Sequence, residues 1–369
     1  MSNFVDIVGF QLEKVHTGVL KWFLETGTTT GTTTKEKYNA IELLYTYKGK
    51  TPPFKEQDIA SISCTPEWSS DDSRIRIDLV TEITLNNVSK RVWLVFEVKT
   101  DSIPYDEQLK NTRDTFKKPG DYVEYFLLLV GTSMIFERRF DGRYGFKTIT
   151  NQQLFGIFNH YGRLPIICDW TEALEREISR FNNVEANLKN TPHGNLNTRA
   201  YWEGHGYRYR FPLWYCLYEK LRVHLKSRDD WEIESGINNP VMHWVKGWQD
   251  NNYNNKNYKT YFEFNDNSYC LKVKIDKKKI GKGKIERDDL NQFRDRMIGK
   301  IQKITNIQQG RPSRKSYGTW NTIYKWEFEF TKMNLKNIAG EVNVINNNIL
   351  PILGGVKCVC PWYKCCKQP

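Results

Sequence analysis

The chain has 369 residues, which is enough for two domains that each bury a core. It carries 55 basic and 43 acidic residues, and the resulting net charge of +12 favours a polyanionic partner over an acidic small molecule. Lysine-rich proteins of other kinds share this balance. The mean hydropathy of −0.65, together with the lack of an apolar run of about 18 residues and of a signal-like N-terminus, predicts a cytoplasmic protein without a membrane partner.

The first part of the chain predicts two helices separated by a loop. Apolar residues recur with a helical period over residues 4–25, and a second helix is expected over 37–47. Between them, the low-complexity segment 27–35 reads as a loop. Glu13 and His16 are three residues apart and therefore share a side of the first helix. Glu13 is either a solvated helix residue or part of a site, and the pattern alone leaves both open.

Three strands are expected next, over 60–68, 74–80 and 91–99, the last two joined through the turn-prone pair Asn86-Asn87. Glu67, at the end of the first of these strands, is a second-tier candidate to approach the acidic residues that follow.

Side chains alternate across a strand, so Glu97 and Lys99 are expected on one face and Phe96 and Val98 on the other. If the strands pair, Asp78 comes beside Glu97. Charges within an apolar sheet need neutralisation, and a hard divalent cation such as Mg²⁺ would provide it. The alternative is a solvated sheet face with a cross-strand ion pair, which the apolar surroundings of Glu97 disfavour.

The remaining elements of the first half alternate between helix and strand. They are expected as a helix over 105–117, strands over 123–130 and 133–140, and helices over 152–158 and 170–181. The continuously apolar run at 123–130 is typical of a strand buried on both faces. The pattern predicts an α/β fold, a mixed central β-sheet flanked by helices.

The order of these motifs resembles the PD-(D/E)XK nuclease superfamily. The resemblance lies in Asp78, in Glu97-Val98-Lys99 and in Gln108 on the following helical segment PYDEQLKNTRDTF. The segment FQLEKVHTGVLKWFL also looks like the first helix of the prokaryotic restriction and defence-associated members. The chain departs from the pattern in having isoleucine before Asp78, where the motif name has proline.

This resemblance implies a restriction-endonuclease-like fold and a role for each matching residue. Asp78 and Glu97 would be metal ligands, Glu13 a further acid of the metal site, Lys99 the catalytic lysine and Gln108 a supporting polar group. The implied activity is Mg²⁺-dependent hydrolysis of phosphodiester bonds, with Mn²⁺ as a substitute. DNA is preferred over RNA, in a bacterial or phage setting of restriction, antiviral defence or DNA processing. A homodimer or a defence-system partner protein would fit that setting.

A polar segment without periodicity, 182–198, predicts a domain boundary, with a nuclease domain over 1–185 and a basic, aromatic-rich α+β domain over 195–369. In the second domain we expect, in chain order, a hairpin over 259–276, a helix over 287–305, a strand over 324–330 and a helix over 335–349.

Two basic segments of the second domain are candidates for nucleic-acid binding. Arginines alternate with aromatic residues in Tyr207-Arg208-Tyr209-Arg210, which suits phosphate contact with base stacking or, equally, the two faces of one strand. The second segment is a lysine run that is either a solvated loop or a non-specific phosphate contact. The candidates are Arg208, Arg210, Lys277, Lys278, Lys279, Lys282 and Lys284.

Eight cysteines are present. Four are spread along the chain and are expected to be ordinary buried thiols. The other four, in the tail CVCPWYKCCKQP, favour an oxidisable tail over a metal site because their spacing is not that of paired CxxC knuckles. Two rival functions stay open: a catalytically dormant nucleic-acid-binding protein that keeps the nuclease fold, and a regulatory protein whose basic charge is incidental.

Overall fold

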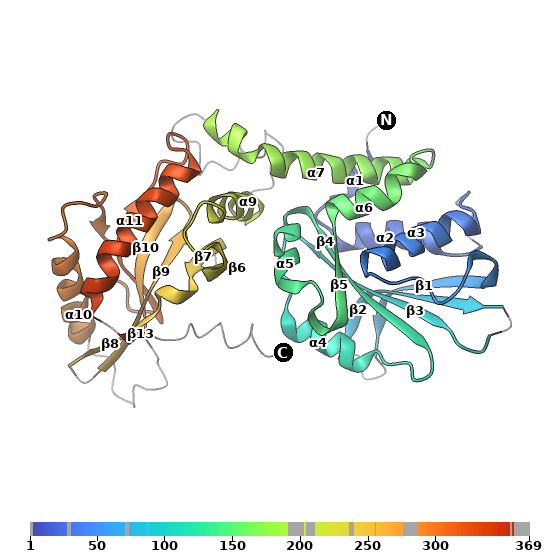
Figure 1. Ribbon diagram of the computed structural model, residues 1–369, viewed down its shortest axis with the longest axis horizontal. Coiled ribbons are helices and arrows are strands. Elements are labelled where there is room, and N and C mark those ends of the chain that lie inside the picture. The colour runs from blue at the N-terminus through green and yellow to red at the C-terminus, as the bar shows by residue number, and fades with distance from the viewer. Residues whose placement is uncertain are drawn as a thin grey trace. The chain divides into compact units, whose positions relative to one another are not determined.

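The computed structural model describes residues 3–27, 31–70, 74–86, 88–190, 203, 211–235, 240–254, 256–275, 287–354 and 356–357. The chain divides into two compact units, Met1–Asn182 and Asn183–Pro369, and the division falls within the long helix α7 (Pro165–Lys189). Both units combine helices with a β-sheet (Figure 1), which confirms the α/β class expected from the sequence. In the described part of the chain, no helix is long and apolar enough to cross a membrane.

The N-terminal unit is built on a five-stranded mixed sheet with the strands in chain order. The first three strands are antiparallel and the last three are parallel. Their bounds are β1 (Ile59–Ser69), β2 (Arg76–Leu85), β3 (Val92–Thr100), β4 (Tyr122–Val130) and β5 (Phe146–Thr150). From Glu124 onward β4 is buried, as expected for a strand that is covered on both faces.

Helices cover both faces of this sheet (Figure 1). One face packs in a single hydrophobic core against α1 (Phe4–Val8), α2 (Glu13–Leu24), α3 (Thr34–Tyr47), α6 (Asn151–Phe158) and α7. Phe96 and Val98 belong to this core, and Phe96 stacks on Phe126 with ring centroids 5.4 Å apart. Helix α4 (Asp106–Thr115) lies on the opposite face. Glu97 therefore projects toward α4, and Lys99, two positions further along, projects from the same face of β3 because successive strand residues alternate.

The single helix expected over residues 4–25 is wrong, because the chain turns between α1 and α2. Gly9 ends α1 with φ at 111°, a backbone conformation that residues with a Cβ rarely adopt. Helix α2 then begins at Glu13. Its His16 is fully buried, accepts a hydrogen bond from Trp170 Nε1 at Nδ1 (3.0 Å) and lies 2.8 Å from Phe10 O through Nε2. These contacts fix the Nε2–H tautomer and connect α2 to α7.

The strand expected over residues 133–140 is also wrong. This segment forms a 3₁₀ turn (Gly131–Phe136) and the short helix α5 (Glu137–Phe140), and the next strand is β5, which the sequence did not predict. Ser133 exchanges hydrogen bonds with the backbone of Ser102, and the Asn151 side chain bonds both the N–H and the C=O of Gly131. These contacts hold the segment as a turn. Other 3₁₀ turns of this unit are Glu56–Asp58, Arg143–Gly145 and Asn159–Tyr161.

The C-terminal unit contains an eight-stranded sheet, antiparallel in every described pair, with helices α9, α10 and α11. The strands are β6 (Trp231–Ser235), β7 (Pro240–Trp244), β8 (Gln249–Tyr253), β9 (Lys256–Asn265), β10 (Ser268–Lys274), β11 (Arg311–Pro312), β12 (Trp320–Glu327) and β13 (Val356–Lys357). The helices are α9 (Phe211–Arg222), α10 (Arg287–Ile301) and α11 (Leu335–Leu353), with 3₁₀ turns at Arg228–Asp230 and Val245–Gly247. The predicted hairpin is confirmed as β9 and β10, whereas β6, β7 and β8 were not expected.

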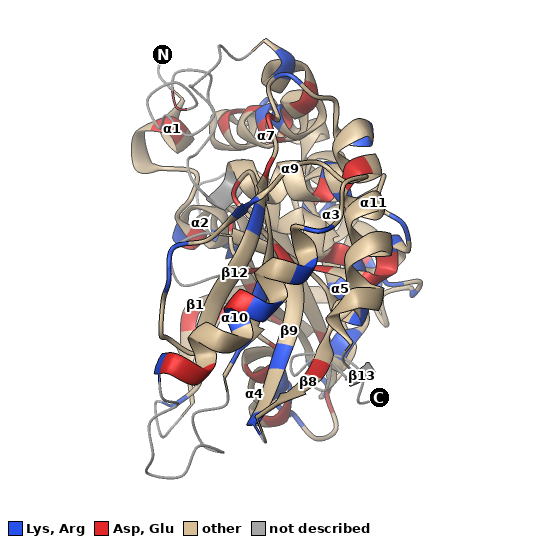
Figure 2. Cartoon of the chain, turned by 90° about the vertical axis from the view of Figure 1, so that its left-hand side faces the viewer, with Lys and Arg blue, Asp and Glu red and all other residues tan. Residues whose placement is uncertain are grey.

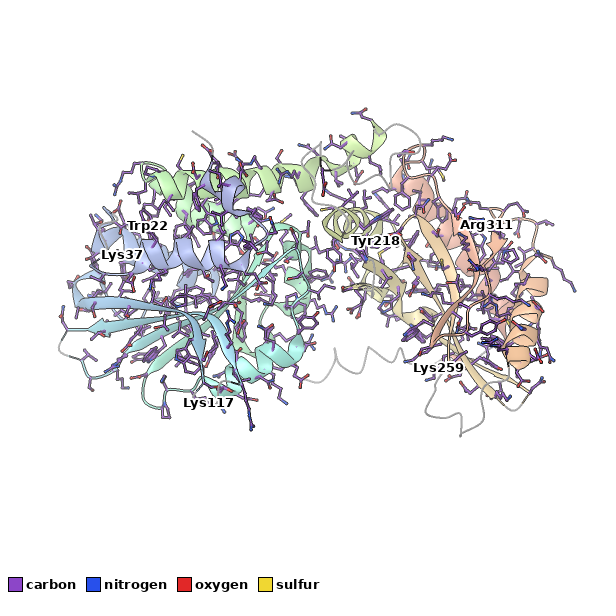
Figure 3. The ribbon with its side chains drawn as sticks, turned by 180° about the vertical axis from the view of Figure 1, so that it is seen from behind. Trp22, Lys37, Lys117, Tyr218, Lys259 and Arg311 are labelled. Atoms are coloured by element: carbon purple, nitrogen blue, oxygen red, sulfur yellow. The ribbon has the colours of Figure 1, made fainter. Side chains whose placement is uncertain are left out.

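Aromatic side chains fill the core of this unit. Tyr218 of α9, labelled in Figure 3, is fully buried and donates its hydroxyl to the backbone oxygen of Asp266 at 3.1 Å. Trp248 and Tyr261 stack with ring centroids 4.2 Å apart. The expectation of buried thiols is confirmed for Cys64, Cys216 and Cys270, whereas Cys168 is only half-buried. Burial raises the pKa of the Cys270 thiol to about 12, which makes it a poor nucleophile.

Ion pairs neutralise many described cations of the C-terminal unit. Acidic and basic segments lie close together on α10 (Figure 2). The pairs include Lys272 with Glu263 at 2.5 Å, Lys246 with Asp230 at 2.9 Å, Arg311 with Glu327 at 2.6 Å and Lys259 with Asp250 at 3.8 Å. Lys259 and Arg311 are labelled in Figure 3. The net positive charge of the chain is therefore not concentrated on the described strands of this unit.

Candidate active site

The candidate site lies where β2 and β3 part. The two strands are paired from Ile83 and Val92 to Leu79 and Phe96, and there their register ends. Beyond this point β2 stays with β1, and β3 stays with β4. The N–H of Val98 donates instead to Oδ2 of Asp78 at 2.7 Å. A carboxylate thus replaces the next backbone acceptor, and the sheet opens beside it.

Lys99 occupies this opening together with two acids. Its Nζ lies 4.0 Å from Oδ2 of Asp78 and 3.5 Å from Oε1 of Glu13, and it donates to the backbone oxygen of Val98 at 2.9 Å. Glu13, in the first turn of α2, also accepts the backbone N–H of Thr100. The Lys99 side chain is only 9% exposed, so its ammonium is held in place by these acceptors.

Glu97 is fully buried next to Asp78, and both of its oxygens are engaged by α4. Gln108 Nε2 donates to Oε2 at 2.8 Å, and Thr112 Oγ1 donates to Oε1 at 2.6 Å. Residues four apart on a helix share a face, so Gln108 and Thr112 reach the same carboxylate. Gln108 was expected from the sequence, whereas Thr112 was not. Thr112 follows Gln108 by four positions on the same helix, and this spacing could have identified it.

The site holds more negative than positive charge. Burial, followed by the charge of Asp78, raises the pKa of Glu97 from 4.5 to about 8, although Thr112 and Lys99 act in the opposite direction. Burial also raises the pKa of Glu13, which Lys99 lowers and Asp78 raises further. One ammonium therefore faces three carboxyl groups. An additional cation would relieve the repulsion between Asp78 and Glu97.

Asp78 and Glu97 fit a magnesium ion in ligand type and number. Mg²⁺ prefers oxygen ligands and is usually held by one or two carboxylates, with waters and substrate phosphate oxygens in the other positions. Within the described ranges, however, no group of three or more His, Cys, Asp and Glu side chains is placed to hold a metal ion. His16 does not contribute, because both of its ring nitrogens face partners in the core. The role of Glu13 as a metal-site acid stays a prediction.

We call Glu13, Asp78 and Glu97 around Lys99 the acidic centre. Glu67 forms its ion pairs with other residues. It is paired with Lys14 at 2.9 Å and with the guanidinium of Arg76. The candidates for nucleic-acid binding lie outside the described residues: Arg208, Arg210, Lys277, Lys278, Lys279, Lys282 and Lys284. The same holds for the four cysteines of the tail.

Comparison with protein-family models, with curated proteins and with solved structures finds no match for this chain.

Proposed function

We propose that the N-terminal unit is a metal-dependent nuclease that hydrolyses phosphodiester bonds, with DNA as its substrate and Mg²⁺ or Mn²⁺ as its cofactor. The observation that carries the proposal is the convergence of Asp78, Glu97 and Lys99 where β2 and β3 part. Two carboxylates and a lysine in a largely buried position are costly for stability, and such groups occur mainly where chemistry needs them. The motif order in the sequence supports the same assignment.

In this mechanism Asp78 and Glu97 would hold the metal ion, which when bound supplies positive charge against the negative charge on the reacting phosphate. Lys99 presents an ammonium beside Asp78, where it can orient the attacking water and stabilise the phosphate oxygens. Glu13 and the Val98 carbonyl fix the position of that ammonium. Gln108 and Thr112 fix the orientation of the Glu97 carboxylate.

The biological setting follows from the resemblance and is part of the proposal. A bacterial or phage enzyme of restriction, antiviral defence or DNA processing would have this domain beside a second, sensing or substrate-binding domain. A homodimer or a partner protein of a defence system is compatible with it. The alternative is a catalytically dormant protein with the same fold. The observation that favours this alternative is that the described residues contain no metal-ligating group of three.

The test is degradation of plasmid, linear duplex, single-stranded DNA and RNA by the full chain, with Mg²⁺, Mn²⁺ or a chelator. Asp78→Asn and Lys99→Met should lose cleavage. Asp121→Asn is a matched control, because Asp121 likewise accepts a backbone N–H, that of Arg91 at 2.9 Å, but outside the site. Lys48→Met matches Lys99→Met, because Lys48 is also a largely buried lysine paired with a carboxylate.

Metal-dependent cleavage that Asp78→Asn abolishes and Asp121→Asn retains supports the proposal. If the chain degrades none of these substrates with either metal, the nuclease proposal fails and the catalytically dormant alternative remains. Cleavage that survives both Asp78→Asn and Lys99→Met would place the activity elsewhere in the chain.

A further inference from the structure

Two exposed basic side chains come from positions next to residues of the acidic centre along the chain. Arg76 precedes Asp78 by two positions on β2 and therefore projects from the same face of the strand. Lys14 follows Glu13 in the first turn of α2. The Arg76 side chain is 57% exposed and the Lys14 side chain is 76% exposed. We name Lys14, Arg76 and the acid between them, Glu67, the rim of the site.

Glu67 holds both cations at once. Its Oε1 lies 2.9 Å from Nζ of Lys14 and also pairs with the Arg76 guanidinium. Glu67 lies opposite Asp78 in the pairing of β1 with β2, between the pairs Pro66 with Leu79 and Trp68 with Ile77. The rim is thus attached to the strand position that carries the proposed metal ligand.

The backbone of Glu67 is strained. Its φ is 49°, in the left-handed region that residues with a Cβ rarely adopt, although the residue lies inside a strand. Such outliers persist where the surroundings hold them, and they are found preferentially at functional sites. Here the strained conformation accompanies the double ion pair with Lys14 and Arg76.

We infer that the rim binds a phosphate of the substrate strand next to the scissile bond, and that the Glu67 carboxylate occupies the position of this phosphate in the free protein. The inference rests on the proposed function, since it takes the ligand to be a nucleic-acid backbone. Binding exchanges one anion for another: the phosphate takes over Lys14 and Arg76, and Glu67 is released.

Three physical properties of these groups favour this exchange. Arginine binds phosphate and carboxylate through the same planar set of donors, so a carboxylate is a chemical stand-in for phosphate at Arg76. Exposed ion pairs are weak, so giving them up costs little. Finally, the acidic centre repels a polyanion, and cations on its edge are needed to bring a phosphate close.

The test measures affinity of the full chain for a labelled DNA oligonucleotide in a chelator, over a range of salt concentrations. Arg76→Gln and Lys14→Gln should each weaken binding about 3- to 10-fold and lower the slope of log affinity against log salt by about 1. Glu67→Gln should act in the opposite direction and tighten binding about 3- to 10-fold, because it frees both cations.

The pair of Glu82 with Arg91 provides matched controls. It joins β2 to the residue that precedes β3, at the far end of the strand pairing from the site. Glu82→Gln and Arg91→Gln should change affinity by less than about twofold. Thermal unfolding of every variant shows whether the fold is retained.

Weaker or unchanged binding by folded Glu67→Gln would overturn the inference, and so would unchanged binding by both Arg76→Gln and Lys14→Gln. Cleavage by the unmodified chain, measured in parallel with Mg²⁺, separates this inference from the proposed function. If the unmodified chain cleaves DNA but the rim variants bind DNA as tightly as it does, the phosphate-binding role of the rim is refuted and the nuclease proposal stands. If the rim variants change affinity as expected but the unmodified chain does not cleave, the nuclease proposal is refuted and phosphate binding by the rim is supported.

Discussion

Val98 donates its backbone N–H to the carboxylate of Asp78 at 2.7 Å, across the point where β2 and β3 part. One side chain therefore ends a strand pairing and stands beside a buried carboxylate on the neighbouring strand. Removing Asp78 therefore has two effects: Val98 loses its backbone partner, and the site loses a charge. Different substitutions can separate them.

Asp78→Ala removes both the charge and the acceptor, whereas Asp78→Asn removes only the charge and keeps an oxygen for Val98. We expect both variants, and Lys99→Ala, to lose at least about 100-fold in cleavage rate, because each lacks a charge that acts on the reacting phosphate. Binding of DNA and the fold should change little in Asp78→Asn. Single-turnover cleavage and oligonucleotide binding measure this. Cleavage by Asp78→Ala at the unmodified rate would refute the assignment.

Glu97 should make the free protein less stable as the pH rises. Its pKa is raised from 4.5 in the unfolded chain to about 8 in the fold, so the folded state binds the proton more tightly. This contribution to stability is complete below about pH 4.5 and is lost as the pH rises through about 8, at up to about 1.4 kcal/mol per pH unit. Glu97→Gln is neutral throughout. In a chelator it should melt at a higher temperature than the unmodified chain at pH 8.5 and at a similar temperature at pH 4.5.

A matched control for this measurement is Glu124→Gln. Glu124 is also a buried carboxylate, but it is paired with Lys48 at 2.6 Å and with Lys50 at 2.7 Å. Its removal leaves the largely buried Lys48 without an ionised partner, so this variant should melt at a lower temperature. If Glu97→Gln also melted at a lower temperature at pH 8.5, the charge imbalance of the site would be disproved.

The sequence predicted those features of the site that depend on local geometry. Alternation along one strand places Glu97 and Lys99 on one face and Phe96 and Val98 on the other, whatever the rest of the fold does. Thr112 was missed because its contact with Glu97 depends on how α4 lies over β3, which is a tertiary property. The turn at Gly9 was missed because the apolar period continues across it.

The same distinction explains the error over residues 133–140. An apolar segment followed by charges fits a strand or a short helix equally well, and its hydrogen-bond partners decide between them. Here Ser133 is bonded to Ser102 and Gly131 to Asn151, partners that lie about 20 to 30 residues away and that no local pattern indicates. The missed strand β5 likewise owes its identity to pairing with β4.

Thr112→Val should weaken metal binding without unfolding the protein, because valine has nearly the shape of threonine but lacks the hydroxyl that donates to Glu97. Loss of such a supporting hydrogen bond typically costs about 10- to 100-fold in metal affinity. The concentration of Mg²⁺ that gives half-maximal cleavage should rise accordingly. Thr171→Val is the matched control: Thr171 is also buried on a helix, but its hydroxyl donates to Ile167 O at 2.8 Å, far from Glu97 along the chain. An unchanged Mg²⁺ requirement in Thr112→Val would show that the Thr112 hydroxyl does not position Glu97.

His16 should matter for stability and not for catalysis, although it lies three residues after Glu13 on α2. Its imidazole is buried between Trp170 Nε1 and Phe10 O, so His16→Leu leaves a donor and an acceptor unsatisfied. We expect a loss of about 2–5 kcal/mol in the free energy of unfolding. Measured at a temperature where the variant is folded, its metal-dependent cleavage should stay within about threefold of the unmodified chain, because both ring nitrogens of His16 are bonded to Trp170 and Phe10. A large loss of cleavage with wild-type stability would instead assign His16 to the site.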